Sequence, residues 1–259
     1  MKHIVSLSSG LSSAVTADRV INKYKDVELV FMDTLIEDED NYRFMNELLK
    51  MWDMPLTILK EGRTPYQVSK DAQIIPNNKI APYTFKLKIE MFTKYLKDIS
   101  GDITIHIGYD YSELHRCERT KKSYGEHGWD VDFPLLWKPI EYRTYEQVSK
   151  EDWGIEPPRM YKMGYSHANC GGVCVKQGWS DWERTLINFP DKFAEAEEWE
   201  RKMRIHPIRK DYELMKDQSG GKTTALTLKE FRERIESKTM NQYDMFSNDS
   251  CVHCGIGDI

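Results

Sequence analysis

The feature of this sequence that most constrains its fold is a regular alternation of two patterns in the first 140 residues. Short runs of apolar and β-branched residues alternate with longer stretches whose apolar residues recur at helical spacing. This order is typical of βαβ units, in which helices cover a parallel sheet. The expected strands are residues 3–8, 27–33, 55–59 and 103–107, and the expected helices are residues 12–25, 41–52 and 83–99.

The pattern changes after Pro134, where further prolines and several glycines and tryptophans break the alternation. The segments from Trp179 onward are again helical in pattern. The sequence therefore predicts an α/β domain with a parallel, Rossmann-like sheet over residues 1–140. A mostly helical C-terminal extension is expected over residues 141–259.

Composition narrows the class of protein. Hydrophobic residues make up 40% and charged residues 31% of the 259 residues, as in ordinary globular proteins. No apolar run approaches the roughly 20 residues that span a bilayer, and the strand-like start leaves no room for a signal peptide, so we expect a soluble, cytoplasmic protein without a membrane partner. The net charge of −5 gives no global attraction to nucleic acid. The basic stretches 116–122 and 201–210 are interpreted as solvated helix faces, and the acidic run 37–40 as charge that complements a helix N-terminus.

A loop of small residues, from Ser8 to Ser13, separates the first expected strand from the first expected helix. At such a place backbone N–H groups and the helix dipole can hold an anion. Small residues let phosphate oxygens approach the main chain, and serine hydroxyls add donors. A plain helix cap uses the same residue types, so the loop alone leaves both interpretations open.

The loop is similar to the PP-loop, S-G-G-x-D-S, of ATP pyrophosphatases and sulfonucleotide reductases. Ser9 stands in place of a glycine, and Ser12 stands in place of the aspartate. Tyr83 likewise replaces the cysteine of the family's P-C-[ST]-x-x-L-K segment. Stretches that resemble the family follow in the family's order at residues 31–34, 82–88, 107–116, 133–136 and 155–165.

The chain thus resembles the PP-loop (adenine nucleotide alpha-hydrolase-like, HUP-type) superfamily, in the branch of the phosphoadenosine phosphosulfate reductases. The resemblance implies an adenine nucleotide, ATP with Mg²⁺, at the carboxyl edge of the sheet, where open α/β folds bind ligands. The implied catalytic residues are Asp33, Lys88 and Arg116, of which the two cations would neutralise charge on the phosphates. The implied nucleotide-binding residues are Ser8, Ser9, Gly10, Ser12, Ser13, Asp33 and Thr34.

Four of the five cysteines form two close pairs, Cys170 with Cys174 and Cys251 with Cys254. In a cytosolic chain such pairs indicate a metal or redox site before they indicate disulfides. We predict one Cys₄ centre, with free buried cysteines as the alternative. Four thiolates suit both Zn²⁺ and a [4Fe-4S] cluster, and the resemblance to cluster-bearing PP-loop sulfur enzymes favours [4Fe-4S].

Three functions remain open at this point. The leading one is an enzyme that binds ATP, adenylates an acceptor and releases pyrophosphate, so that sulfur or nitrogen can replace the acceptor oxygen. The acceptor would be a nucleobase of a nucleic acid or a small molecule. The second is a sulfonucleotide (PAPS or APS) reductase, for whose C-terminal cysteine motif Cys254 is a superficial match. The third is a non-catalytic nucleotide-sensing or nucleic-acid-binding module, which the missing loop aspartate supports. The sequence leaves a monomer and a homodimer open.

Overall fold

Five parallel strands form the main sheet of the protein. The computed structural model describes residues 1–77, 80–140, 143–205, 214–217 and 223–237. The strand order across the sheet is β3-β2-β1-β4-β5. The strands are β1 Lys2–Leu7, β2 Val27–Asp33, β3 Leu56–Lys60, β4 Ile103–His106 and β5 Asp130–Asp132.

The direction of winding reverses at β1. The chain passes from β1 outward through β2 to β3, and then returns to the other side of β1 to form β4. Ile4 of β1 is therefore paired with Glu28 on one side and with Ile105 on the other. A reversal of this kind opens a crevice at the carboxyl ends of the two central strands, where doubly wound folds bind ligands.

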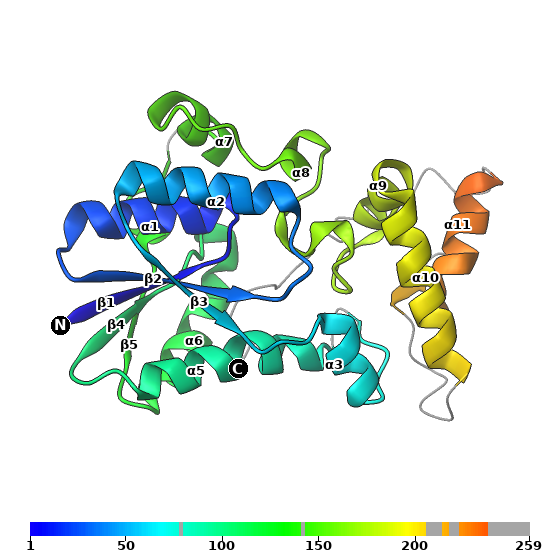
Figure 1. Ribbon diagram of the computed structural model, residues 1–259, viewed down its shortest axis with the longest axis horizontal. Coiled ribbons are helices and arrows are strands. Elements are labelled where there is room, and N and C mark those ends of the chain that lie inside the picture. The colour runs from blue at the N-terminus through cyan, green and yellow to red at the C-terminus, as the bar shows by residue number, and fades with distance from the viewer. Residues whose placement is uncertain (78–79, 141–142, 206–213, 218–222, 238–259) are drawn as a thin grey trace.

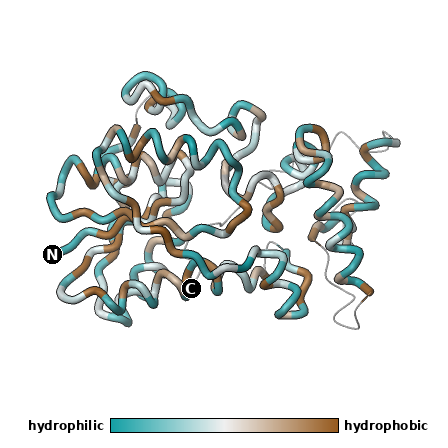
Figure 2. Tube along the Cα trace, in the orientation of Figure 1, coloured by the Kyte–Doolittle hydropathy of each residue, from teal (hydrophilic) through white to brown (hydrophobic). Residues whose placement is uncertain are grey.

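Helices cover both faces of this sheet (Figure 1). Val5 and Leu7 face α1 and α2, whereas Ile4 and Ile105 face α5 and α6. Because successive side chains point to opposite faces and both faces are covered, most residues of β1 and β2 are buried, including polar ones such as His3 and Ser6. Figure 2 shows the hydrophobic residues gathered where the strands run between the two helical layers. These helices are α1 Leu11–Lys23, α2 Glu39–Trp52, α5 Glu90–Lys97 and α6 Leu114–Gly125.

The C-terminal extension is mostly helical, as expected, but it also contains a two-stranded antiparallel sheet of β6 and β7 that the sequence did not indicate. Both strands are three residues long, which is too short for a period-2 pattern to be visible. The remaining elements are α3 Pro65–Asp71, α4 Pro82–Thr84, α7 Tyr145–Gln147, α8 Arg159–Lys162, α9 Trp179–Asn188, α10 Pro190–Ile205, β6 Met215–Asp217, β7 Thr224–Leu226 and α11 Leu228–Glu236, with short 3₁₀ or π turns at Phe85–Ile89, Tyr111–Glu113, Pro134–Leu136, Val148–Asp152 and Asn169–Gly172.

The core of the extension continues into the first part of the chain. Trp182, Phe193 and Phe231 of the extension share one apolar cluster with Val68 and Leu87. In the other direction, residues that follow position 141 pack on α1 and α2. The apolar clusters thus join residues from both sides of residue 140. The division of the chain into two domains at that residue stays a prediction. No helix in the described part of the chain is long and apolar enough to cross a membrane.

The expected strands agree with the observed ones to within one residue at each end. The single long helix expected over residues 83–99 is instead divided into α4, a π-helical turn at Phe85–Ile89, and α5. A π turn adds a residue to the helical repeat and shifts the direction of its side chains. The buried Lys88 lies within this π turn.

Gly108, which follows β4, lies against the first turns of α1. A Cβ atom at Gly108 would lie 2.9 Å from Thr16 Oγ1 and 3.2 Å from the Ser12 carbonyl oxygen. We therefore expect Gly108→Ala to lower the free energy of unfolding by about 1 kcal/mol, because the helix must shift to admit the methyl group. The matched control is Gly125→Ala at the end of α6, where an added Cβ meets open space. Urea denaturation compares the two variants, and an equal effect of both would contradict the close approach.

Candidate functional site

The loop between β1 and α1 lies at the reversal point of the sheet and is organised by its own serines. Ser13 Oγ accepts a hydrogen bond from the Ser8 N–H at 3.0 Å and donates one to the Gly10 carbonyl at 2.8 Å. Ser9 adopts a left-handed conformation, with φ of 58°. These contacts turn the chain sharply from strand into helix without a long side chain in the loop.

The first turn of α1 presents backbone donors at this edge. The backbone hydrogen bond from the Ala14 N–H to the carbonyl of Gly10, the residue before the helix, is 3.1 Å long, so the N–H groups of Ser12 and Ser13 precede the helical ladder. The Leu11 N–H is engaged by the hydroxyl of Tyr161 at 3.2 Å. The sequence placed Tyr161 in a family-like stretch but gave it no role, because the contact joins residues 150 positions apart.

Asp33 ends β2 and is almost fully buried. Its Oδ1 accepts hydrogen bonds from the Leu35 N–H at 2.9 Å and the Tyr42 hydroxyl at 2.8 Å, and its Oδ2 lies 3.0 Å from Lys60 Nζ. Burial alone would raise the pKa of the Asp33 carboxyl, but these three donors lower it, and it stays ionised. The observed contacts make Asp33 the anchor of the turn after β2.

The turn after β2 continues into an acidic segment. Leu35 is left-handed, with φ of 64°, an uncommon conformation for a residue with a branched side chain. Thr34 Oγ1 donates to Glu37 Oε1 at 3.0 Å, and the N–H of Cys170 donates to Glu37 Oε2 at 2.8 Å. Burial raises the pKa of the Glu37 carboxyl, against the opposing charge of Lys88. Glu37 therefore ties the sheet edge to a cysteine of the extension, a role that the sequence analysis did not assign to it.

Lys88 and Arg116 are both buried, with 6% and 2% of their surface exposed. Arg116, in the first turn of α6, pairs with Glu113, and its guanidinium lies 4.1 Å from the ring centroid of Tyr109. Lys88 interacts electrostatically with Glu37 and with Cys170. The interpretation of residues 116–122 as a solvated face is therefore wrong for Arg116. Contact of Lys88 and Arg116 with a nucleotide stays a prediction.

Cys170 and Cys174 are brought together, as predicted from their spacing, and both are buried. The hydrogen bond with Cys174, together with burial, raises the pKa of the Cys170 thiol. Residues 170–172 are all left-handed, and a Cβ atom on Gly171 would lie 2.7 Å from the Ile36 carbonyl oxygen. The cysteine turn thus packs tightly on the segment that follows β2. Cys251 and Cys254 lie outside the described residues.

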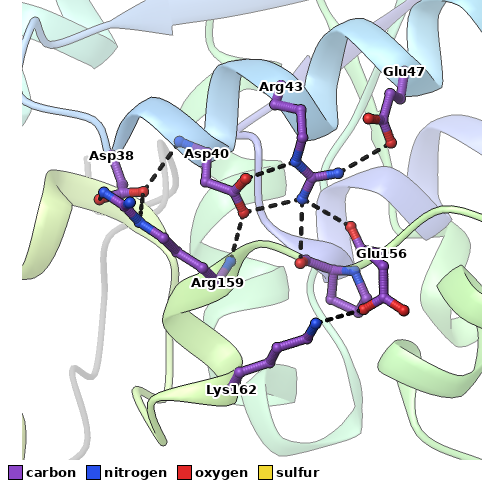
Figure 3. A network of polar contacts seen from close by, with 8 residues as sticks. Asp38, Asp40, Arg43, Glu47, Glu156, Arg159 and Lys162 are labelled. Atoms are coloured by element: carbon purple, nitrogen blue, oxygen red, sulfur yellow. Dashed lines mark hydrogen bonds and ion pairs between the residues drawn. The ribbon is translucent and has the colours of Figure 1, made fainter.

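A polar network fixes the N-terminus of α2 against the segment that carries Tyr161 (Figure 3). Asp38, which is fully buried, caps α2 by accepting from the Asp40 N–H at 3.1 Å, as the interpretation of residues 37–40 implied. Arg159 binds the Asp38 carboxylate through Nε at 2.8 Å and through Nη2 at 2.9 Å. The Arg159 N–H donates to Asp40 Oδ2 at 2.7 Å. The network therefore positions Tyr161 for its contact with the loop.

Known proteins are similar to parts of this chain. Residues 2–126 match the family model for the phosphoadenosine phosphosulfate reductase domain. An uncharacterised nin region protein of Escherichia phage lambda, ORF290, is 33% identical over 148 residues, which cover 46% of this chain and 51% of that protein. An uncharacterised protein of Methanocaldococcus jannaschii is 25% identical over 172 residues, which cover 64% of this chain and 39% of that protein. The matches thus cover about half or less of the length of these relatives.

A solved structure is also similar to the chain. The phosphate complex of phosphoadenylyl-sulfate (PAPS) reductase from Candida auris is 19% identical, with a TM-score of 0.47, and the match covers 65% of this chain and 81% of that one. The family-model match covers β1 to the end of α6, the part that contains the Ser8–Ser13 loop and the reversal point of the sheet. Over residues 2–126, just under half of the chain, the protein is therefore similar to the phosphoadenosine phosphosulfate reductase domain, which is consistent with the PP-loop superfamily.

Proposed function

We propose that the chain binds ATP with Mg²⁺ at the carboxyl edge of the main sheet, adenylates an acceptor and releases pyrophosphate. The observation that carries this proposal is the loop at the reversal point of the sheet. There the N–H groups of Ser12 and Ser13 precede the first helical hydrogen bond, and the small residues of the loop would let phosphate oxygens approach the main chain. The loop would hold the pyrophosphate portion of the nucleotide.

The reaction needs little covalent chemistry from the protein. An acceptor oxygen attacks the α-phosphorus, a bond forms between them, and the bond to the bridging oxygen breaks as pyrophosphate leaves. Mg²⁺, when bound, would neutralise charge on the phosphates. Lys88 and Arg116 would do the same from the protein side, and a buried cation acts more strongly than a solvated one because the local dielectric constant is lower. Asp33 would orient the nucleotide or Mg²⁺ through the turn that it anchors.

The experiment that tests this proposal separates products. The chain is incubated with ATP, Mg²⁺ and candidate acceptors, namely bulk tRNA, DNA and a pool of small carboxylates and amides, and AMP and pyrophosphate are assayed against ADP and phosphate. We expect AMP and pyrophosphate in equal amounts with one acceptor class, and a loss of about a hundredfold in rate for Lys88→Gln. The matched control is Lys86→Gln in the same turn, whose lysine forms a surface ion pair with Glu90. ADP as the product, or no turnover with any acceptor, would contradict adenylation.

A second candidate is a sulfonucleotide reductase, which the description of the matching family model favours. In that reaction a thiolate attacks the sulfate sulfur and displaces the nucleotide, and a second thiol then releases sulfite as a disulfide forms. Cys254, the cysteine considered for this role in the sequence, lies outside the described residues. Release of sulfite from PAPS or APS in the presence of a dithiol reductant would favour this candidate over adenylation.

We further propose that Cys170 and Cys174 hold a metal centre together with Cys251 and Cys254, as a [4Fe-4S] cluster in preference to Zn²⁺. The pair fits two ligand positions, because its thiols are adjacent, buried and held in a tight turn. Within the described residues no group of three or more histidine, cysteine, aspartate or glutamate side chains is arranged to bind a metal. The remaining ligands of the proposal are therefore Cys251 and Cys254.

Replacement of one cysteine tests the metal proposal. Cys170→Ser should lower the content of bound iron or zinc in anaerobically purified protein, because the loss of one of four thiolate ligands weakens metal binding. Cys117→Ser changes a buried cysteine of α6 and serves as the control, with unchanged metal content expected. A cluster would give the protein a brown colour, whereas about one equivalent of zinc would leave it colourless. Metal-free wild-type protein would contradict the proposal.

A further inference from the structure

A cavity of about 570 Å³ lies between the segment that follows β2, helix α3 and helix α10. This volume falls in the range of small-molecule sites in proteins. Helix α3 lies beside α10 (Figure 1), and the ring of Tyr66 on α3 meets the ring of Trp199 on α10. The cavity is therefore bounded by the α/β domain on one side and by the extension on the other.

Two aromatic rings form one corner of this cavity. The ring centroids of Tyr66 and Trp199 are 4.9 Å apart, and their planes meet at 65°. The Tyr66 hydroxyl donates to the Val173 carbonyl at 3.0 Å, which fixes the ring. Burial raises the pKa of Tyr66, so the phenol stays neutral. Two rings at a steep angle present electron-rich faces, which attract organic cations.

The cations on the cavity wall form ion pairs, whereas two of its carboxylates form none with the residues that the structure describes. Its two cations, Arg159 and Lys192, are both held by the buried Asp38 carboxylate, at 2.8 Å and 3.7 Å. Lys192 also donates to the Gly171 carbonyl at 3.1 Å. In contrast, the exposed carboxylates of Glu39 and Glu195 also line the cavity, and within the described residues neither forms a hydrogen bond or an ion pair. Two carboxylates therefore remain available to a positively charged occupant.

We propose that this cavity binds an organic ammonium group, with the cation against the rings of Tyr66 and Trp199 and its charge balanced by Glu39 and Glu195. An aromatic corner combined with carboxylates is the chemistry that recognises alkylammonium groups. An anion or a second phosphate would face the two available carboxylates and is disfavoured.

The cavity lies next to the proposed nucleotide site, but the proposed binding of an ammonium group does not depend on nucleotide binding. Leu35, Ile36 and Glu37 line the cavity, and they directly follow Thr34 at the carboxyl end of β2. An ammonium-bearing molecule in the cavity would thus lie next to the proposed nucleotide site, as the second substrate. Binding of the cation needs no nucleotide, so its measurement stays informative if the proposed adenylation fails.

The test compares a cation with its neutral isostere on the full chain, by isothermal titration calorimetry at constant ionic strength. The probes are choline and 3,3-dimethylbutan-1-ol, which share their shape and differ in charge. We expect choline to bind at least about tenfold more tightly than the alcohol, on the scale of a desolvated cation–π contact. Spermidine and N-acetyl-lysine amide form two further arms, which distinguish a free polyamine from a lysine side chain as the source of the ammonium group.

Variants of the residues that line the cavity show where choline binds. Trp199→Leu should weaken choline binding about tenfold, whereas Trp199→Phe, which keeps a ring, should retain most of the affinity. Glu195→Gln should weaken it several-fold, and Glu118→Gln, the same charge change on an exposed residue of α6, should leave it unchanged. The proposal is overturned if choline and the alcohol bind equally, if no ammonium probe binds at millimolar concentration, or if Trp199→Leu and Glu195→Gln bind choline like the wild type.

Discussion

Gly10→Val should abolish the binding of adenine nucleotide while the protein stays folded. Gly10 precedes α1 with φ of −92° and ψ of 162°, an extended conformation that valine adopts without strain. Its side chain would stand where the proposal places phosphate oxygens, against the N–H groups of the first helical turn. We expect ATP affinity to fall by at least about a hundredfold, since displacement of the phosphates removes several charge-assisted hydrogen bonds.

The control for this variant is the same substitution at another glycine. Gly125→Val adds a side chain at the end of α6, where a Cβ meets open space, and should leave ATP affinity unchanged. Circular dichroism and urea denaturation show whether each variant is folded. Wild-type affinity in a folded Gly10→Val variant would remove the Ser8–Ser13 loop from the nucleotide site.

Asp38→Ala should have the largest effect on stability among single changes in the polar network, a loss of about 2 kcal/mol in the free energy of unfolding. The substitution removes the side chain that caps α2, which contributes about 1 kcal/mol. It also removes the partner of Arg159 and Lys192. Because these cations are partly exposed, at 44% and 39% of their side-chain surface, water compensates for part of the lost ion pairs, and we expect them to add only about 1 kcal/mol.

Two further variants separate the contribution of the helix cap from that of the ion pairs. Asp38→Asn keeps a capping side chain and loses the charge, so it should cost about half as much as Asp38→Ala. Glu47→Ala removes an exposed i,i+4 partner of Arg43 in the same network (Figure 3) and should change stability by less than about 0.5 kcal/mol. Equal losses in all three variants, measured by urea denaturation, would show that the cap and the ion pairs of Asp38 contribute no more than the exposed ion pair of Glu47.

The sheet could be predicted closely because its central strands are buried on both faces and therefore contain short runs of apolar residues, such as Ile4–Val5 and Leu29–Met32. Strand β5 was missed, since it has only three residues and two of them are aspartates. Helix α6 is largely polar, so periodicity gave little signal there, and the burial of Arg116 depends on Tyr109 and Glu113 rather than on its neighbours in the pattern.

In the candidate site, features that rest on local contacts could be predicted from the sequence, whereas features that rest on contacts between distant residues could not. The Ser8–Ser13 loop is contiguous, and its hydrogen bonds are local, so sequence reasoning could find it. The contact of Glu37 with Cys170 and that of Tyr161 with Leu11 could not be found in this way, because the partners lie more than a hundred positions apart in the chain. The pairing of Cys170 with Cys174 was visible from spacing, but the left-handed turn that presses Gly171 on Ile36 arises only from tertiary packing.

The central claim, that an adenine nucleotide binds at the carboxyl edge of the sheet through the loop after β1, is tested most directly by amide hydrogen exchange with and without ATP and Mg²⁺. N–H groups that bind phosphate oxygens exchange more slowly. We expect protection of the peptides that cover residues 8–16 and 33–37, with no such protection in Gly10→Val protein. Protection confined to α10 and α11, or none at ATP concentrations that saturate binding, would contradict the claim.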